Sequence, residues 1–410
     1  MKYFFPDSQD LIDPSFDFET ETRSSSRIRQ RDDLYAHEVF NSPPYDGLLI
    51  SKAIVDGMGV KYTLAQRHRL YREGVRRFLR IDKNKYNSQL ETMGDCGAFS
   101  YVLEEVPPFS VDEVIDFYEE CGFDYGISVD HIILGYKESL DNTLLHLDAV
   151  PLEWRRRQEI TLELAQDFLR RHQVRQCQFR PIGVAQGWSP ASYAFSVKEL
   201  QKMGYRLIAL GGMVPLKTLD IIACLRKIQE VRHPQTCLHL LGITRCENIG
   251  SFAQYGVVSF DSTTPLLQAF KDFKDNYYAK DRTYAAIKVP QVESNNKLKN
   301  LIKAGKVKQE DAIKYEKKCL SLLQEYDRNN ASLDQVLQAL KDYETLYDRK
   351  RNRIDVYREV LIDRPWKACE CVICRQLGIN VIIFRGSERN RRRGFHNIYV
   401  FYNRLKQYLD

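Results

Sequence analysis

The sequence predicts an α/β fold in which eight βα units close into a (β/α)8 barrel, with a helical insertion near the end of the chain. Short β-branched, apolar runs alternate with helix-like stretches, and at least six such strands can be counted before residue 262. Strands that are apolar throughout and alternate with helices are typical of a parallel sheet buried on both faces. No Gly-x-Gly-x-x-Gly loop opens the first unit, which favours a closed barrel over an open dinucleotide-binding sheet.

Runs of apolar residues that stop at a glycine or a polar residue predict the strands. They lie at 47–55, 78–81, 125–129, 181–185, 205–210, 237–242 and 256–261. Two Ser-x-x-Glu capping boxes, which begin at Ser110 and Ser196, predict helix starts, because their side chains satisfy backbone donors that a helix leaves unpaired. A longer helix is expected from Pro151 to about residue 174, since proline suits a first helical turn.

Length and composition indicate a protein built of two parts. The chain has 410 residues, whereas single hydrophobic cores stop growing near about 250 to 300 residues. No stretch approaches the ~18 consecutive apolar residues of a membrane span, and acidic residues follow the first methionine too early for a signal peptide. We therefore expect a soluble, cytoplasmic protein that makes no membrane contact and keeps its cysteines reduced. The net charge of +6 permits a polyanionic partner without requiring one.

Two polar segments have two interpretations each. The first 40 residues carry four arginines between residues 23 and 31, either as a solvated loop or as an arm that contacts phosphates. Residues 297–318 hold eight lysines against three acidic residues, either as a solvated helical hairpin or as a nucleic-acid contact. The predicted parts are the main part of the barrel (1–290), a lysine-rich helical insertion (291–360) and a last segment (361–410).

Polar residues or glycines stand where several predicted strands end. They are Asp95, Asp130, Gln186, Gly211, Gly212 and Asp261. A single acid in such a place is explained by capping of the following helix. The carboxyl ends of parallel strands, however, meet at one mouth of a barrel, where the active sites of barrel enzymes lie. Three carboxylates and an amide in equivalent places therefore favour a shared site.

Three cysteines and a histidine predict a metal site in the last segment. Cys369, Cys371 and Cys374 lie within six residues, and His396 follows at the far end of a loop. Three thiolates and one imidazole form a closed tetrahedral set that suits a structural Zn²⁺ ion. The segment 361–410 is therefore predicted to be a zinc-binding subdomain.

The other cysteines and the arginines near the histidine have simpler interpretations. The remaining cysteines, at positions 96, 121, 177, 224, 237, 246 and 319, are scattered and are interpreted as small core residues. Arginines at positions 389, 391, 392 and 393 precede the histidine and are interpreted as a phosphate contact.

Taken in order, these motifs resemble those of the tRNA-guanine transglycosylases. The matching residues are Gly94-Asp95-Cys96-Gly97-Ala98-Phe99, Val129-Asp130, Val184-Ala185-Gln186-Gly187, Leu210-Gly211-Gly212, Phe260-Asp261 and the Cys-x-Cys-x-x-Cys motif with its distant histidine. The resemblance covers residues from about 45 to 410. It implies a (β/α)8 barrel of the TIM type with the zinc-binding subdomain inserted before the final helix, for which residues 397–409 are the candidate.

Three departures from the tRNA enzymes point to a particular branch. Gly97-Ala98-Phe99-Ser100 replaces the usual Gly-Gly-Phe/Tyr-Gln, and Ser262-Thr263-Thr264-Pro265 stands where Pro-Thr-Arg is expected. The interval from Asp261 to Cys369 is also longer, because it contains the lysine-rich stretch. Together these features look most like the bacterial branch that acts on DNA, the 7-deazaguanine DNA transglycosylases.

The resemblance implies a reaction and a role for each strand-end residue. Guanine is exchanged for a 7-deazaguanine base through a covalent aspartyl-nucleoside intermediate, with Asp261 as nucleophile and Asp95 as either a proton shuttle or a carboxylate that orients the base. Retaining glycosyl chemistry of this kind places the two carboxyls about 5 to 5.5 Å apart. Asp130 and Gln186 would read the edge of the base. A backbone N–H near Gly212, beside Gly211, would donate to its carbonyl oxygen.

The resemblance also implies partners. These are DNA, a free base that is 7-cyano-7-deazaguanine, and a separate ATPase; a duplex would have to release the target nucleotide from its stack. Two alternatives stay open at this point. The protein could be a transglycosylase that acts on tRNA, or a non-catalytic, zinc-dependent nucleic-acid-binding protein for which the barrel is a scaffold.

Overall fold

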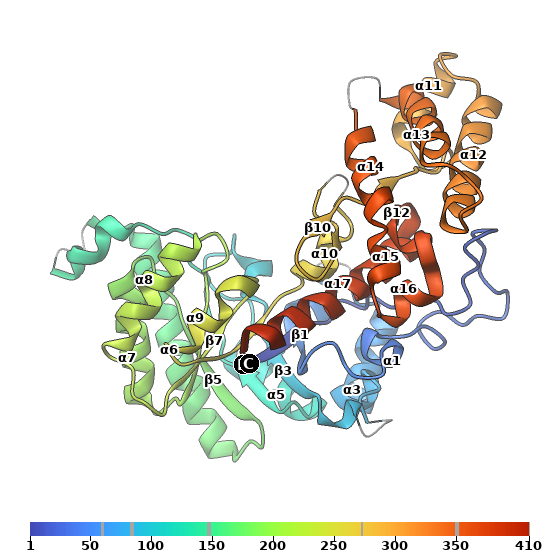
Figure 1. Cartoon of the computed structure of the whole chain (residues 1–410). Helices are drawn as coiled ribbons and strands as arrows, with labels where there is room; N and C mark the ends of the chain where they lie inside the picture. Colours follow the sequence, from blue (N-terminus) through green and yellow to red (C-terminus); the bar gives the residue numbers. More distant parts are fainter. Residues whose placement is uncertain (59–60, 83–85, 146–148, 272–273, 349–351, 410) are drawn as a thin grey trace. The chain divides into compact units, whose positions relative to one another are not determined.

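The computed structural model describes residues 1–410 except 59–60, 83–85, 146–148, 272–273, 349–351 and 410 (Figure 1). It contains two compact units, each described here by itself. The barrel unit comprises Met1–Gln9, Tyr45–Thr263 and Arg404–Asp410, and the second unit comprises Asp10–Pro44 and Thr264–Asn403. The division expected at residues 290 and 360 stays a prediction. Among the described residues, no helix is both long enough and apolar enough to cross a membrane.

Eight parallel strands close the barrel, which confirms the predicted fold class. They are β1 (Lys2–Pro6), β2 (Gly47–Ser51), β3 (Glu91–Asp95), β4 (Tyr125–Ile127), β5 (Arg180–Ala185), β6 (Leu207–Leu210), β7 (Cys237–Leu240) and β8 (Val257–Asp261). Each strand pairs with the next along the chain, and β1 pairs with β8 in a register that sets Phe4 opposite Asp261. The strands therefore all point the same way, so their carboxyl ends share one mouth.

Apolar side chains fill the inside of the barrel. One buried cluster joins residues of six strands: Phe4, Leu49, Met93, Tyr125, Ile127, Ile182, Val184 and Ala209. Glycines on β3 and β4 allow the outer layer to approach, because a Cβ on Gly94 or Gly126 would lie 2.3 or 2.5 Å from the ring of Tyr118. The barrel is thus a packed core, and its polar groups gather at the mouth.

Helices follow the strands and cover the sheet. The longer ones are α3 (Leu64–Glu73), α5 (Val111–Cys121), α6 (Leu152–Arg175), α7 (Pro190–Met203) and α8 (Thr218–Gln229), and shorter ones are α2 (Lys52–Val55), α4 (Val75–Phe78) and α9 (Ile249–Ala253). The start of α5 is as predicted, since the Ser110 side chain accepts from Glu113 N and the Glu113 carboxylate accepts from Ser110 N. Pro151 precedes α6, as its first-turn proline predicted.

The structure corrects several local predictions, including the second half of the strand expected at 47–55, where residues 52–55 form α2. Residues 75–78 form α4, so the strand expected at 78–81 is wrong. The Ser196 capping box is wrong too, because α7 begins about two turns earlier, where the Ser189 side chain accepts from Ser192 N. Two strands were not predicted: the Tyr-Phe-Phe core of β1 is short and polar sequence follows at once, and β3 has charged ends and a glycine. Hydrogen bonds to β2 and β8 on its two sides stabilise β1, although the run is too short to be recognised as a strand from its own sequence.

The second unit is mainly helical. Its helices are α1 (Ala36–Val39), α10 (Thr264–Gln268), α11 (Asn296–Lys303), α12 (Gln309–Asp327), α13 (Leu333–Tyr347), α14 (Ile354–Asp363), α15 (Pro365–Ala368), α16 (Val372–Leu377) and most of α17 (Gly386–Leu409). Two small sheets pair β9 (Tyr277–Tyr278) with β10 (Thr283–Tyr284) and β11 (Ile287–Lys288) with β12 (Ile383–Phe384). The eight lysines of 297–318 are all exposed, and both interpretations of them stay open.

The scattered cysteines mostly pack as predicted. Five are buried, at positions 96, 121, 177, 224 and 319, whereas Cys237 is partly exposed. The side chain of Cys246 lies outside the described part of the chain.

Candidate functional site

The six predicted site residues lie at the carboxyl ends of strands. Asp95 and Asp261 are the last residues of β3 and β8. The others follow strands directly or within three residues: Gln186 after β5, Gly211 and Gly212 after β6, and Asp130 after β4. Because the barrel is parallel and closed, these ends meet at one mouth. The structure therefore brings all six to the same end of the barrel.

Asp130 and Gln186 form a buried hydrogen-bonded pair. Gln186 Nε2 donates to Asp130 Oδ2 at 2.7 Å, and Gln186 Oε1 accepts from the backbone N–H of Ile133 at 3.1 Å. The two side chains are only 2% and 1% exposed. With both ends of the amide engaged, the orientation of Gln186 is fixed. One N–H of the amide and part of the Asp130 carboxylate remain for a ligand.

Cys96 and Tyr101 complete the surroundings of Asp130. The Cys96 thiol donates to Asp130 Oδ1 at 3.2 Å, and the Tyr101 hydroxyl lies 3.1 Å from both Cys96 Sγ and the Asp130 carbonyl oxygen. Burial raises the pKa of the Cys96 thiol well above its usual value, so the thiol keeps its proton and acts as a donor. Burial raises the pKa of Asp130 to about 6, against the hydrogen bonds from Cys96 and Gln186. Cys96 is thus part of the site as well as of the core.

Asp95 is held in its protonated form by its surroundings. Burial raises its pKa to about 8, and repulsion from Asp130 and Asp261 adds to the shift, against hydrogen bonds from the backbone of Gly97 and Cys96. The charges of Asp130 and Asp261 therefore act on Asp95 at the mouth of the barrel. At neutral pH Asp95 therefore carries a proton that it can donate.

Backbone approaches side chains closely at Gly211 and Gly212. A Cβ on Gly211 would lie 2.2 Å from Gln186 Nε2, and one on Gly212 would lie 2.2 Å from the carbonyl oxygen of Ile133. Gly212 also has a φ of +72°, which glycine adopts without strain. Tyr193 donates its hydroxyl to Gly211 O at 2.7 Å. This part of the site is consequently built of main chain.

Asp261 is anchored through one oxygen. Its Oδ1 accepts from the backbone N–H of Gly242 at 3.0 Å and lies 3.2 Å from His239 Nε2. His239 Nδ1 lies 2.8 Å from Ser259 Oγ. The arrangement fits an imidazole that takes a hydrogen from Ser259 at Nδ1 and donates Nε2–H to the carboxylate. No hydrogen bond reaches the second oxygen, Oδ2, from the described residues.

The sequence did not single out His239. It lies fully buried in β7, inside the run 237–242 that predicted a strand. A usable signal was present, because His239 is the one strongly polar side chain in that run and the strand that ends at Asp261 comes next. In the structure His239 is in register with Ser259, two residues before Asp261 on β8. Side chains two apart on a strand share a face.

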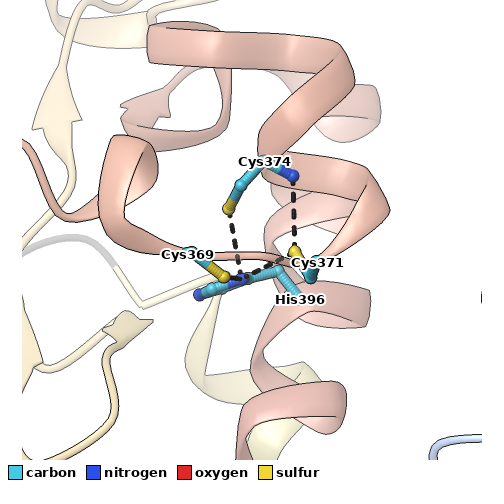
Figure 2. Close-up of side chains that lie close together, drawn as sticks. All are labelled: Cys369, Cys371, Cys374 and His396. Atoms are coloured by element: carbon cyan, nitrogen blue, oxygen red, sulfur yellow. Dashed lines mark hydrogen bonds between the residues drawn. The ribbon is translucent and has the colours of Figure 1, made fainter.

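Cys369, Cys371, Cys374 and His396 meet in the second unit (Figure 2). His396 Nδ1 lies 3.6, 3.4 and 3.3 Å from the three sulfur atoms in chain order. Around a tetrahedral ion with Zn–S and Zn–N bonds of usual length, the S···N edges are ~3.5 Å. The four side chains could therefore hold a metal ion, and their ligand atoms all lie within 4.8 Å of one another. They come from the segment around α16 and from α17.

Neighbouring groups orient this cluster. His396 Nε2 lies 2.7 Å from the carbonyl oxygen of Tyr278, which accepts its hydrogen and leaves Nδ1 directed at the sulfur atoms. The Tyr277 ring stacks on the imidazole with centroids 4.2 Å apart, and its hydroxyl lies 3.3 Å from Cys374 Sγ. Support of this kind is usual for metal-ligating histidines.

The arginines beside the cluster do not form a phosphate contact. Arg389, Arg392 and Arg393 are at most 5% exposed. Arg389 pairs with Glu21, Arg392 with Glu388 at 2.7 Å, and Arg393 donates to backbone carbonyls, including that of Ala269 at 2.6 Å. The predicted phosphate contact is therefore wrong for these three, which stabilise the unit internally. Arg391 is partly exposed and lies 3.4 Å from Glu388.

Two of the four arginines in the first arginine segment pair with buried carboxylates of the same unit, whereas the other two have exposed side chains. Arg27 makes two bonds to Asp33, at 2.7 and 2.8 Å, and lies 3.0 Å from Asp13. Arg23 pairs with Glu388 at 2.9 Å. These two side chains are engaged with carboxylates, and the pairs tie residues 10–44 to α17.

Comparison with known proteins gives a full-length relative. No family model matches the chain. The chain is 53% identical over 420 residues to a protein from Salmonella montevideo named DNA-guanine transglycosylase, and the match spans 100% of this chain and 98% of that protein. This similarity confirms the branch that the sequence motifs predicted. The chain belongs to the DNA-guanine transglycosylase family.

Proposed function

We propose that this protein is a base-exchanging glycosyltransferase that replaces guanine in DNA by a 7-deazaguanine base, 7-cyano-7-deazaguanine, through a covalent aspartyl-nucleoside intermediate. The family and the name of the relative support the activity and the polymer. The observation that carries the mechanism is the geometry of Asp261, which has one anchored oxygen and one oxygen without a partner among the described residues. A nucleophilic carboxylate needs a fixed position and a free lone pair.

In the first step, Asp261 Oδ2 attacks the anomeric carbon of the nucleoside. The carbon–oxygen bond forms as the bond to guanine N9 breaks, and the leaving base takes the electron pair. Asp95, which carries a proton at neutral pH because its pKa is raised to about 8, protonates the departing base. In the second step the incoming base gives its N9 proton to Asp95 and displaces Asp261. Two inversions leave the configuration retained.

His239 and Gly242 hold the nucleophile during both steps. Their N–H groups both point at Oδ1, so this oxygen carries the stabilised negative charge and Oδ2 faces the sugar. The same donors stabilise the carboxylate when it leaves in the second step. We assign His239 as a positioning residue, with Ser259 fixing its tautomer.

Asp130, Gln186 and Gly212 are the proposed base-reading groups. Asp130 accepts from the ring N–H and the amino group of a guanine-like base, and the free N–H of Gln186 completes the pattern. The N–H of Gly211 is already used, because it donates to Ala185 O at 3.1 Å. The neighbouring N–H of Gly212 has no acceptor among the described residues and is the better donor to the carbonyl oxygen of the base.

We further propose that the cysteine–histidine cluster holds a structural Zn²⁺ ion. A closed set of four protein ligands leaves no position for substrate, which is the pattern of structural sites. When bound, the ion would link the segment around α16 to α17. A free 7-deazaguanine base, a DNA duplex and a separate ATPase are the proposed partners, and a cytoplasmic location stays an expectation.

The exchange reaction is tested with labelled guanine. Purified protein should release or incorporate label with guanine-containing duplex DNA and not with tRNA. Asp261→Ala should reduce exchange by about 10⁴-fold or more, because no nucleophile remains, and no covalent protein–DNA adduct should form. Glu120→Ala, at an exposed acid of α5, serves as the control and should keep full activity. Exchange by the Asp261→Ala variant would show that the nucleophile is misassigned.

His239→Phe should lower kcat by roughly 10- to 100-fold with little change in KM for DNA. The reason is that the ring volume is kept while one of the two donors to Asp261 is lost. His239→Gln retains an N–H donor and should recover part of the loss. Steady-state kinetics of the three proteins provide the check, and equal kcat for the phenylalanine and glutamine variants would contradict the positioning role.

Asp95→Asn should raise the free energy of unfolding above that of the wild type, and the gain should be larger at pH 8 than at pH 5. The folded protein keeps the Asp95 proton to about pH 8, whereas an unfolded chain loses it near pH ~4. The folded state thus binds the extra proton between these values, and its stability falls as pH rises through them. Asparagine has no carboxyl proton to release, so the variant does not lose stability in this way as the pH rises. Thermal unfolding from pH 5 to 8 measures the difference in Tm between the variant and the wild type, and the control Glu120→Gln should show no change of this difference with pH. A difference in Tm for Asp95→Asn that does not grow with pH would exclude the raised pKa.

Cys371→Ala should lose metal and stability together. Removing one of four ligands weakens a structural zinc site strongly, and binding free energy of such sites is folding free energy. Zinc content by elemental analysis and Tm should both fall relative to the wild type. Cys319→Ala, at a buried cysteine of α12 outside the cluster, should keep its zinc. A Cys371→Ala protein that is metal-free and as stable as the wild type would contradict the proposal.

A further inference from the structure

The loop after β3 displays apolar side chains to solvent beside the site. Leu103 is 94% exposed, Phe99 67% and Val106 51%. Large apolar side chains that are exposed together on one loop mark a surface that another molecule covers. Leu103 shows the greatest exposure of the three, and nothing in the local sequence requires a leucine at a solvated turn.

The exposure of Leu103 is built into the loop. The carbonyl of the residue before it, Val102, accepts from Arg157 Nη2 at 2.8 Å, and the carbonyl of the residue after it, Glu104, lies 2.9 Å from His131 Nε2. Both partners belong to the protein beyond β4, and His131 is fully buried. Two fixed carbonyls on either side hold the backbone in place, so the leucine side chain is held outward.

The same loop is joined to the proposed base-reading groups. Tyr101, two residues before Leu103, is buried and bonds to Cys96 Sγ and to the Asp130 carbonyl, each at 3.1 Å. Gly97, at the other end of this turn, gives its backbone N–H to Asp95. The exposed leucine therefore stands on a rigid frame that is shared with two of the three site carboxylates.

Charge on the loop indicates which part of a nucleic acid it meets. Glu104 and Glu105 follow Leu103 directly and are exposed. Their carboxylates repel phosphates, so the tip of the loop is unsuited to the sugar–phosphate backbone. The apolar side chain of Leu103, in contrast, suits the stacked faces of bases. Other apolar side chains follow strands at the same mouth, Leu134 after β4 at 38% exposure and Val214 after β6 at 50%.

We propose that Leu103 is a wedge that enters the base stack of duplex DNA where the target guanosine has left it. This inference rests on the proposed function, since a base inside a duplex cannot reach a carboxylate at the mouth unless it swings out. The gap left in the stack is apolar, and aliphatic side chains inserted at such steps stabilise the opened duplex. Leu103 thus acts on opening of the duplex, and it has no part in the exchange at the sugar carbon.

The test compares Leu103→Ala with the wild type on two DNA substrates. One is a fully paired duplex, and the other carries the same target guanine in an unpaired bubble. Leu103→Ala should lower the ratio of kcat/KM on duplex to kcat/KM on bubble by about 10-fold, because only the duplex needs opening. Leu103→Met, which keeps an apolar side chain of similar volume, should restore most of the ratio. Val174→Ala, at a 75% exposed position in the last turn of α6, is the matched control and should leave the ratio unchanged.

A second readout needs no exchange activity. With 2-aminopurine placed next to the target guanine, binding of the wild type should raise its fluorescence, and binding of Leu103→Ala should raise it by less than half as much. An unchanged ratio, or an equal loss on both substrates with an unaltered fluorescence rise, overturns the wedge. Failure of the wild type to exchange guanine in either substrate would instead refute the proposed function, and the fluorescence measurement would still decide on the wedge.

Discussion

Parallel pairing between β1 and β8 closes the barrel, and the arrangement of the mouth depends on that closure. The pairing joins residues 2–4 at the start of the chain to residues 259–261, so that the strand carrying Asp261 is fixed on both sides. On its other side β7 presents His239 and leads into Gly242, the two groups that hold Oδ1. A strand end with neighbours on both sides cannot shift without breaking a ladder of hydrogen bonds. Hydrogen-bonded strands on both sides therefore fix the position of the proposed nucleophile.

Collecting carboxylates at one mouth lowers stability, and the protein offsets this in different ways. Asp95 stays protonated at neutral pH, Asp130 is held by a thiol and an amide, and Asp261 is held by an imidazole and a backbone N–H. Three chemically identical side chains thus acquire three different electrostatic environments. The proposed division into acid, base reader and nucleophile follows from these surroundings and not from the residue type.

Residues whose position follows from strand periodicity could be predicted, and residues whose role depends on contacts across strands could not. Asp130, Gln186 and Gly212 were found because each stands where an apolar run stops. His239 was missed as a site residue and Cys96 was interpreted as a core residue, since each gains its role from a partner 22 or 34 positions away. The prediction for the arginines near His396 was wrong for the opposite reason. A run of arginines is usually exposed, but here distant groups such as Glu21 pair with them in the interior of the unit. Long-range ion pairs of this kind leave no local pattern. The strand β1 was missed because its stability comes from its neighbours.

The close approach of Gly211 and Gly212 to Gln186 and Ile133 has a consequence for how this family can diverge. At these positions the wall of the proposed base site is main chain, with no room for even one added methyl group. Main-chain donors are the same whatever residue supplies them, so substitution there can abolish the wall but cannot retune it. A change in which base is accepted therefore has to arise from side chains, such as Asp130 and Gln186, which are proposed to contact the edge of the base. In this part of the site the main chain is a fixed wall, and the side chains opposite it are the parts that substitution can alter.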